Sequence, residues 1–262
     1  MAKHKKQIPV ALTIAGSDSG AGAGIQADLK TFSAFNVYGT CAITCVTAQN
    51  PETVNGIQAV DPALVNEQIR TVCEGFSISA AKTGMLYSAG IILSVVKAIQ
   101  TCNIKNVVVD PVMIATSGAR LIHEEAVEIM LGKLFPLATV IIPNIPEAEV
   151  ILRHHVKTLY EMKNAAMSIG TQYNCACIIK GGHLPGNKAI DVLYYQGKTI
   201  INSSAKVKAE ETHGTGCVFS AAITALLAKG YKLPEAFKKA KAFVISALKK
   251  RIQVGTHYPL NL

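Results

Sequence analysis

The sequence contains no tryptophan, and aromatic residues make up only 6% of its 262 residues. Nucleic-acid surfaces that stack bases use aromatic side chains, so this shortage argues against such a surface. The chain does carry a formal charge of +9, from 26 basic and 17 acidic residues. No basic stripe is interleaved with aromatic residues. We therefore expect no nucleic-acid partner, and a mild attraction for phosphorylated small molecules.

Long apolar runs are also missing, and none reaches the length that crosses a membrane. The N-terminal lysines followed by the apolar residues 8–15 imitate a secretory signal. That run is short, however, and it continues directly into a glycine-rich loop. We interpret it as the first strand of the fold and expect no membrane partner.

The chain has seven cysteines, an odd number, and their spacing is not that of a disulfide framework. This usage is typical of a reducing compartment and predicts a cytoplasmic protein. Two close pairs, Cys41 with Cys45 and Cys175 with Cys177, have apolar neighbours and do not form a zinc-binding set. Buried small residues in strands are the better interpretation.

Half of the residues are apolar and 16% are charged, which is the composition of a compact globular chain. We find no internal repeat, low-complexity tract or linker. A single α/β domain of this length can bury a sizeable core, so we predict one domain spanning residues 1–262.

Short apolar segments rich in β-branched residues alternate with helical patterns, which predicts a mostly parallel sheet covered by helices on both faces. Segment 52–56 is expected to lead into a small hairpin or a lid. We expect strands at 8–15, 40–46, 80–82, 106–110, 139–142 and 175–180, and a hairpin of 189–195 with 199–203. We expect helices at 25–35, from 61–62 onward, and at 88–101, 123–135, 146–152, 158–170, 214–229 and 233–251.

Polar and glycine residues follow six of the predicted strands. Ligands of open parallel sheets bind outside the carboxyl ends of the strands, so we expect these residues to meet at one rim. They occur in segments 16–18, 47–50, 82–85, 110–113, 143–147 and 180–183.

Segment 211–217 (ETHGTGC) precedes a long apolar helix. The open amides and partial positive charge of a helix start suit a phosphate or an oxyanion. Gly214 and Gly216 let the main chain approach such a group closely. Cys217 is expected in the first turn, where the helix field lowers the pKa of a thiol. A glycine-containing helix start with a buried cysteine is the structural alternative.

Asn144 and Glu147 come directly after a strand, where an amide and a carboxylate can hold magnesium through its waters beside nucleotide phosphates. As a structural alternative, Glu147 is a helix-start residue favoured by the helix dipole. Asp110, which precedes a proline, has a similar alternative as an N-cap or turn residue. Lys180, at the end of an apolar strand, must reach solvent or an anion.

Seven segments together resemble the hydroxymethylpyrimidine/phosphomethylpyrimidine kinases of thiamine biosynthesis. They occur in the family's order and cover nearly the whole chain. They are 16–31 (GSDSGAGAGIQADLKT), 47–50 (TAQN), 82–86 (KTGML), 110–113 (DPVM), 143–149 (PNIPEAE), 180–183 (KGGH) and 212–217 (THGTGC).

The resemblance implies a ribokinase-like three-layer sandwich, with ATP and Mg²⁺ at one end and the phosphate acceptor at the other. It implies two successive phosphorylations, of 4-amino-5-hydroxymethyl-2-methylpyrimidine and then of its monophosphate to the diphosphate, in thiamine biosynthesis or salvage. It also suggests a homodimer.

For the acceptor, Gln49 matches the family's pyrimidine-binding glutamine and offers a donor and an acceptor from one amide. We expect Asp28 to accept from the amino group of the pyrimidine. Met85 is expected to pack on the ring, with ordinary core packing as its alternative. Gly16 and Ala23 are expected to leave room for the flat ring.

Positioning and charge neutralisation dominate phosphoryl transfer. We expect the amides of Gly214, Thr215, Gly216 and Cys217 to hold the transferring group, and Lys180 to add positive charge. In many ribokinase-like enzymes, an aspartate stands where this chain has Cys217, and it removes the proton from the acceptor hydroxyl. The cysteine is expected to assist deprotonation, with the amides contributing more.

His213 is expected to touch the bound monophosphate in the second step, and Glu147 and Asp110 are expected to order magnesium. The residues expected near the nucleotide and its phosphates are Asp110, Asn144, Glu147, Lys180 and Thr212.

Gly20 and Ala21 stand where many members of the family have serine and glycine, which changes the loop more than the pocket. Residues 50–55 resemble an insertion-tolerant flap. The nearest alternative is a pyridoxine/pyridoxal kinase, with which Gln49 and Cys217 are equally compatible. A non-catalytic sensor of thiamine precursors is a further alternative, but it predicts losses at the phosphate end, where the expected residues are all present.

Overall fold

The computed structural model describes residues 7–113, 122–182, 186–207 and 213–262. Within these residues a nine-stranded sheet has the strand order β3-β2-β1-β4-β5-β6-β7-β8-β9. The strands are β1 (Val10–Asp18), β2 (Tyr38–Gln49), β3 (Val54–Ala59), β4 (Ile78–Thr83), β5 (Val107–Val109), β6 (Val140–Ile141), β7 (Ala176–Gly181), β8 (Lys188–Tyr195) and β9 (Lys198–Ala205).

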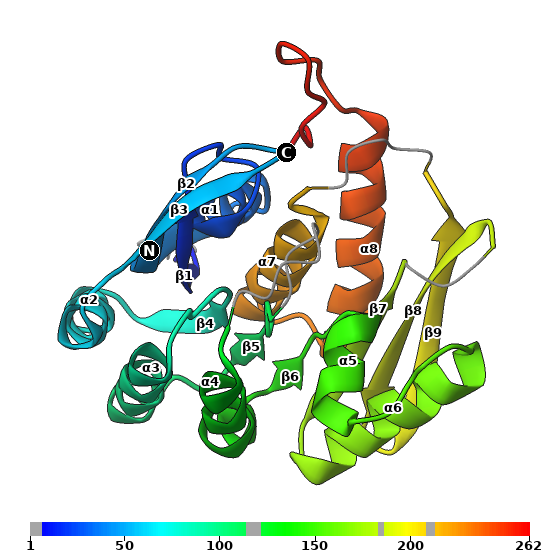
Figure 1. Ribbon diagram of the computed structural model, residues 1–262, viewed down its shortest axis with the longest axis horizontal. Coiled ribbons are helices and arrows are strands. Elements are labelled where there is room, and N and C mark those ends of the chain that lie inside the picture. The colour runs from blue at the N-terminus through cyan, green and yellow to red at the C-terminus, as the bar shows by residue number, and fades with distance from the viewer. Residues whose placement is uncertain (1–6, 114–121, 183–185, 208–212) are drawn as a thin grey trace, which may run out of the picture.

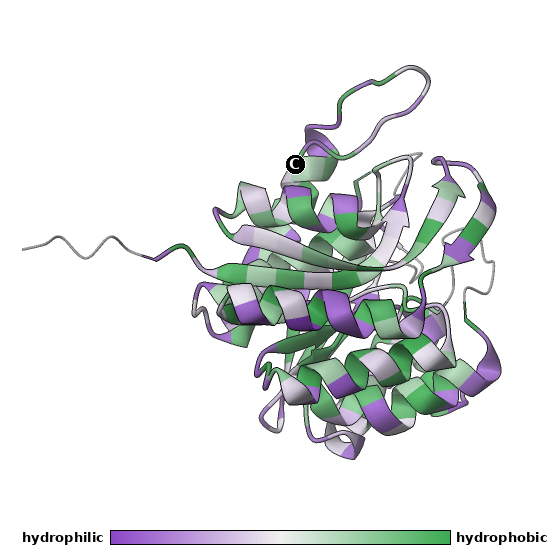
Figure 2. Cartoon of the chain, turned by 90° about the vertical axis from the view of Figure 1, so that its left-hand side faces the viewer, coloured by the Kyte–Doolittle hydropathy of each residue, from purple (hydrophilic) through white to green (hydrophobic). Residues whose placement is uncertain are grey.

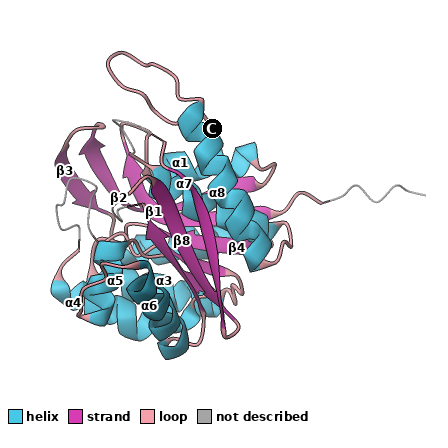
Figure 3. Cartoon of the chain, turned by 90° about the vertical axis from the view of Figure 1, so that its right-hand side faces the viewer, coloured by secondary structure: helices cyan, strands magenta, loops and turns pink. Residues whose placement is uncertain are grey.

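The helices cover both faces of this sheet, as Figures 1 and 3 show. One layer contains α1 (Gly24–Ala34), α7 (Thr215–Ala228) and α8 (Leu233–Lys249). The other layer contains α2 (Pro62–Gly75), α3 (Ala89–Thr101), α4 (Glu124–Ile129), α5 (Ile145–Leu152) and α6 (Leu159–Gln172).

The central strands β2, β1, β4, β5, β6 and β7 pair in parallel, while β3 and the β8–β9 hairpin add antiparallel pairs at the two edges. The expected α/β three-layer sandwich with a mostly parallel sheet is therefore confirmed. Because the strands from β2 to β7 run in one direction, their carboxyl ends meet along a single edge.

Apolar packing holds the three layers together. One buried cluster joins the sheet to α2, α3, α4, α5 and α6, and two smaller clusters join its other face to α1, α7 and α8. Polar and apolar residues alternate along the outer helices in Figure 2, as expected when one face packs on a sheet and the other meets solvent. No helix in the described part of the chain is long and apolar enough to cross a membrane.

The first two strands extend further than the sequence pattern predicts. β1 continues through a bulge between Ala15 and Ser17 as far as Asp18, and β2 continues to Gln49. The predicted ends, at residues 15 and 46, are therefore wrong. The polar residues beyond them are still paired in the ladder, because hydrogen bonding between neighbouring strands outweighs local propensity.

The predicted helix at 123–135 is divided into shorter pieces. A regular α4 gives way to a π-helical turn (Met130–Leu134) and a 3₁₀ turn (Phe135–Leu137). Pro136 lacks a backbone N–H and therefore cannot continue the α-helical pattern, which accounts for the break.

Helix caps fall where the sequence indicates them. The Asp61 side chain accepts hydrogen bonds from the amides of Ala63 and Leu64 at the start of α2. At the start of α6, Thr158 and Glu161 form a capping box. The hairpin predicted after residue 52 is also present, because β3 returns antiparallel to β2.

A buried ion pair joins α8 to the edge hairpin. The Lys241 ammonium lies 2.8 Å from Oδ2 of Asp191 and 2.9 Å from the carbonyl oxygen of Ala189. Oδ1 of Asp191 accepts the amide of Gly181 at 3.0 Å, which fixes the end of β7. The pair therefore connects α8, β8 and β7.

Replacing Lys241 by methionine should destabilise the fold, since it leaves the Asp191 carboxylate buried without its cation. We expect the free energy of unfolding, measured in urea, to fall by about 3 kcal/mol. Lys239→Met is the control, because Lys239 makes an exposed 3.7 Å pair with Glu235, and it should change stability by less than about 0.5 kcal/mol. Equal effects in the two variants would contradict a structural role for the buried pair.

Candidate active site

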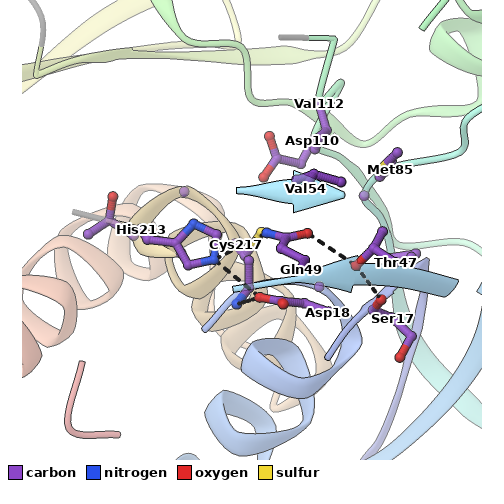
Figure 4. A pocket seen from close by; sticks show the side chains of 18 of the residues that line it. Ser17, Asp18, Thr47, Gln49, Val54, Met85, Asp110, Val112, His213 and Cys217 are labelled. Atoms are coloured by element: carbon purple, nitrogen blue, oxygen red, sulfur yellow. Dashed lines mark hydrogen bonds and ion pairs between the residues drawn. The ribbon is translucent and has the colours of Figure 1, made fainter. Parts of the chain in front are cut away.

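A cavity of about 220 Å³ opens at the carboxyl edge of the sheet. Residues from all six predicted strand ends line it, together with the start of α7 and the turn between β2 and β3. Figure 4 shows side chains from these separate segments converging on one space. The prediction that these segments meet at one rim is confirmed.

Asp18, at the end of β1, organises the glycine loop. Its carboxylate accepts the amides of Gly20 at 2.8 Å, Gly22 at 3.2 Å and Ala23 at 2.8 Å. Burial raises the pKa of this carboxyl, but the hydrogen bonds from His213 and from the loop amides outweigh burial and bring the pKa below its ordinary value. Asp18 therefore remains ionised and holds the loop closed at neutral pH.

His213 connects this loop to the segment before α7. Its Nε2 lies 3.1 Å from Oδ2 of Asp18 and 3.4 Å from Nε2 of Gln49 (Figure 4). A β-carbon on Gly22 would lie 2.6 Å from the imidazole ring, so the ring fits only because residue 22 is glycine. The loop after β1 and the start of α7 therefore form one wall of the cavity.

Gln49 faces the cavity from the last position of β2. The Thr47 hydroxyl lies 3.2 Å from Oε1 of Gln49 and 2.9 Å from the carbonyl oxygen of Ser17. Because Nε2 of His213 donates to Asp18, it does not also accept from the Gln49 amide nitrogen. The Gln49 amide can therefore offer a donor and an acceptor to a heterocyclic ring.

Small residues and a thioether complete this end of the cavity. Gly16, Ala23 and Met85 all line it. A β-carbon on Gly16 would lie 2.8 Å from Sγ of Cys45 and 3.7 Å from Sδ of Met85. Glycine at position 16 therefore leaves free the space beside the Met85 sulfur.

The start of α7 also lines the cavity, through Gly214, Thr215, Gly216 and Cys217. Gly214 occupies the N-cap position with φ of +80°, so α7 begins without a capping side chain. A β-carbon there would overlap the carbonyl oxygen of Gly22. The main chain of α7 can approach the glycine loop this closely only with glycine at 214.

Lys180 brings positive charge beside this helix start. Its ammonium lies 2.8 Å from Oδ1 of Asp110, whose Oδ2 accepts the Ser220 hydroxyl of α7 at 2.8 Å. A β-carbon on Gly216 would lie 3.6 Å from the Lys180 nitrogen. Burial alone lowers the pKa of Lys180, but the Asp110 and Glu147 carboxylates raise it above its ordinary value, so Lys180 stays charged.

Asn144 and Glu147 form a capping box at the start of α5. The Asn144 side chain accepts the amide of Glu147 at 2.9 Å, and Oε2 of Glu147 accepts the amide of Asn144 at 2.8 Å. Oε1 of Glu147 accepts the amide of Met113 at 3.1 Å. Glu147 therefore has the helix-start role that was the structural alternative to magnesium binding. Both residues also line the cavity. Burial raises the pKa of Glu147, and Lys180 opposes the rise.

The expected lowering of the Cys217 pKa is wrong. Burial raises the pKa of this thiol to about 11, and the nearby charge of Lys82 offsets only part of the rise. The thiol is therefore protonated at neutral pH, because desolvation of a thiolate outweighs the field of the helix start.

The expected contact between Asp28 and the acceptor is not supported. The Asp28 side chain is fully buried, is not among the residues that line the cavity, and bonds to the Lys82 ammonium at 2.8 and 2.9 Å. The Thr13 hydroxyl donates to the same carboxylate at 2.6 Å. Both carboxylate oxygens of Asp28 are therefore engaged by Lys82, and Oδ2 also accepts from Thr13.

Thr212 lies outside the described residues. The structure brings the other expected residues to one cavity: Gly16, Ala23, Gln49, Met85, Asp110, Asn144, Glu147, Lys180, His213, Gly214, Thr215, Gly216 and Cys217. Sequence reasoning assigned no role to Asp18 or Lys82. A lysine inside the apolar strand β4 was the available signal for Lys82, and an acidic residue before a run of glycine amides was the signal for Asp18.

A family model for phosphomethylpyrimidine kinase matches residues 18–261. The hydroxymethylpyrimidine/phosphomethylpyrimidine kinase of Bacillus subtilis is 42% identical over 256 residues, which cover 96% of this chain and 93% of that protein. The pyridoxine kinase of the same organism is 42% identical, with 100% and 94% covered.

A crystal structure of an ADP complex of Bacillus subtilis pyridoxal kinase superimposes with a TM-score of 0.90 at 39% identity, covering 97% of both chains. The thiamine biosynthesis bifunctional protein ThiED of Geobacter sulfurreducens is 40% identical over 95% of this chain, and the match spans about half (51%) of that longer protein. The fold and the rim cavity define a ribokinase-like small-molecule kinase. Within that class, the chain belongs to the phosphomethylpyrimidine kinase family.

Replacing Gly214 by alanine should disrupt the joint between the glycine loop and α7. Gly230→Ala is a matched control, because Gly230 has φ of +82° but open space where the β-carbon would lie. We expect the control to lose about 1 kcal/mol of stability from backbone strain alone. Gly214→Ala should lose more, and its affinity for ADP, measured by calorimetry, should fall at least tenfold. Equal losses in the two variants would contradict the tight contact with Gly22.

Proposed function

We propose that this protein transfers the terminal phosphoryl group of ATP to 4-amino-5-hydroxymethyl-2-methylpyrimidine, and then phosphorylates the resulting monophosphate to the diphosphate. These products would serve thiamine biosynthesis or salvage. The observation that carries the proposal is that Gln49 and the start of α7 line the same cavity. A ring-reading amide and a phosphate-binding helix start can thus contact one small molecule.

At the acceptor end, Gln49 would read a ring nitrogen and the amino group, and Met85 would pack on the ring. Gly16 and Ala23 would leave room for its flat face. The place of Gln49 at the last position of β2, facing the cavity, supports this role. His213, beside Gln49, would contact the monophosphate in the second step.

At the phosphate end, the amides of residues 214–217 would stabilise the transferring phosphoryl group, with Lys180 neutralising charge. The acceptor oxygen forms a bond to the terminal phosphorus while the bond from phosphorus to the bridging oxygen breaks. The electron pair leaves with ADP, and the hydroxyl proton passes to solvent water. Such transfers depend on positioning more than on a strong base, so a neutral Cys217 thiol is compatible with turnover.

Asp110 and Glu147 would hold a hydrated magnesium ion beside the phosphates, with Asn144 and Thr212 near the nucleotide. Magnesium fits this donor set because it usually keeps several waters and takes one or two carboxylates plus substrate phosphates. Each carboxylate oxygen has one protein donor and retains capacity for a water-mediated contact. No group of three metal-binding side chains occurs among the described residues. When bound, the ion would neutralise charge on the phosphates.

We also propose a cytoplasmic homodimer. All seven cysteines are free thiols, which suits a reducing compartment. Val46 of β2 and Val54 of β3 are exposed at the sheet edge, where a second copy could pack. Size-exclusion chromatography with light scattering would measure the mass in solution.

Incubation with ATP and hydroxymethylpyrimidine should give first the monophosphate and then the diphosphate. Phosphorus NMR or mass spectrometry can monitor this time course. The second candidate is a pyridoxine/pyridoxal kinase, favoured by the 0.90 TM-score to the pyridoxal kinase. Steady-state rates on hydroxymethylpyrimidine, its monophosphate and pyridoxine should therefore be compared. Turnover of pyridoxine more than tenfold faster than that of hydroxymethylpyrimidine would overturn the main proposal.

Cys217→Ser should retain turnover within about threefold of the parent, because the half-buried thiol is protonated and the amides of α7 remain in place. The rate with hydroxymethylpyrimidine and saturating ATP measures this. A fall of a hundredfold or more, at unchanged ADP affinity, would instead give Cys217 a direct chemical role.

A further inference from the structure

Lys82 and Asp28 form a fully buried ion pair under the cavity. Both side chains have 0% exposure, and the ammonium lies 2.8 and 2.9 Å from the two carboxylate oxygens. Burying two charges carries a large desolvation cost, and apolar residues of similar volume often stabilise a protein as well or better. Stability alone therefore does not account for a charged pair at this place.

Lys82 is among the residues that line the cavity, although its side chain is buried. Lys82 and Gly84 both line it, and a β-carbon on Gly84 would lie 3.5 Å from the Lys82 nitrogen. Among the described residues, the two oxygens of Asp28 are the hydrogen-bond acceptors found for this ammonium. An ammonium has three donors, so one N–H remains for a bound molecule.

A second lysine has the same arrangement across the cavity. Lys180 is paired with Asp110, and a β-carbon on Gly216 would lie 3.6 Å from its nitrogen. Lys82 comes from β4, next to Met85, whereas Lys180 comes from β7, next to the start of α7. Two lysines that line the cavity are thus each paired with a carboxylate.

The positive charge of Lys82 is permanent. Burial alone lowers the pKa of this lysine, but the adjacent Asp28, with Cys217 and Asp110, raises it above its ordinary value. Lys82 therefore does not act as a proton acceptor. Among the groups near Cys217, Lys82 lowers the pKa of that thiol the most. A negative charge developing in the same space is stabilised in the same way.

We propose that Lys82 is a catalytic residue that contacts the attacking hydroxyl oxygen of the acceptor and stabilises the negative charge that develops there. Asp28 is its positioning residue. The inference rests on the proposed kinase function and adds a second cation to it. The acceptor oxygen releases its proton to solvent water and bonds to the terminal phosphorus of ATP as ADP leaves, and Lys82 keeps all its protons throughout.

The test removes both charges together, in Asp28→Asn with Lys82→Met, so that no unpaired charge is left buried. The matched control is Asp191→Asn with Lys241→Met, which neutralises the other buried pair, outside the cavity lining. With hydroxymethylpyrimidine and saturating ATP, kcat of the first double variant should fall about a hundredfold or more. The control should stay within about twofold. ADP affinity should be unchanged in both, which separates this role from a structural one.

A second readout does not require turnover. The rate at which iodoacetamide labels Cys217 at pH 9.5, measured by peptide mass spectrometry, should fall when the Lys82 pair is neutralised, because Lys82 lowers the pKa of this thiol more than Asp28 raises it. It should not fall in the control. A kcat within threefold of the parent, or unchanged labelling of Cys217, would overturn the inference.

The two proposals fail in different ways. If the unaltered protein does not phosphorylate hydroxymethylpyrimidine, the proposed function is wrong, and labelling alone decides whether Lys82 supplies charge to the cavity. If the unaltered protein is active and the Lys82 variant is equally active, the proposed function stands and Lys82 has no catalytic role.

Discussion

The carboxylate of Asp18 is the interaction on which the rest of the site depends. It gathers three amides of the glycine loop and the imidazole of His213, and so ties the end of β1 to the segment before α7. A loop that turns its amides inward needs a buried anion to satisfy them, because unpaired amides are costly. Without this anion the glycine loop would not be tied to the segment before α7.

Charge in the cavity is balanced in pairs. Asp28 holds Lys82 and Asp110 holds Lys180, while Glu147 is satisfied by backbone amides. Each lysine keeps its proton because a carboxylate compensates for burial. The cavity therefore presents fixed positive charge without rearrangement, which suits the binding of groups that carry negative charge.

The sequence was sufficient for the layered fold and for the set of segments that meet at the rim, because periodicity and strand order follow from local patterns and from the parallel arrangement. The sequence did not predict the features that long-range contacts determine. The end of β2 at Gln49 depends on pairing with β1 and β3, and the neutral state of Cys217 depends on burial. The role of Asp28 was misjudged because its partner, Lys82, lies 54 positions away.

Gln49 belongs to the hydrogen-bonded ladder, paired with Val54 across the hairpin. The residue proposed to recognise the acceptor thus lies in a paired β-strand and not in a loop. Little conformational entropy is lost when it engages a ring, so affinity there comes from preorganisation. Evolution could alter ring preference on such a support by exchanging single side chains, which leaves the backbone untouched.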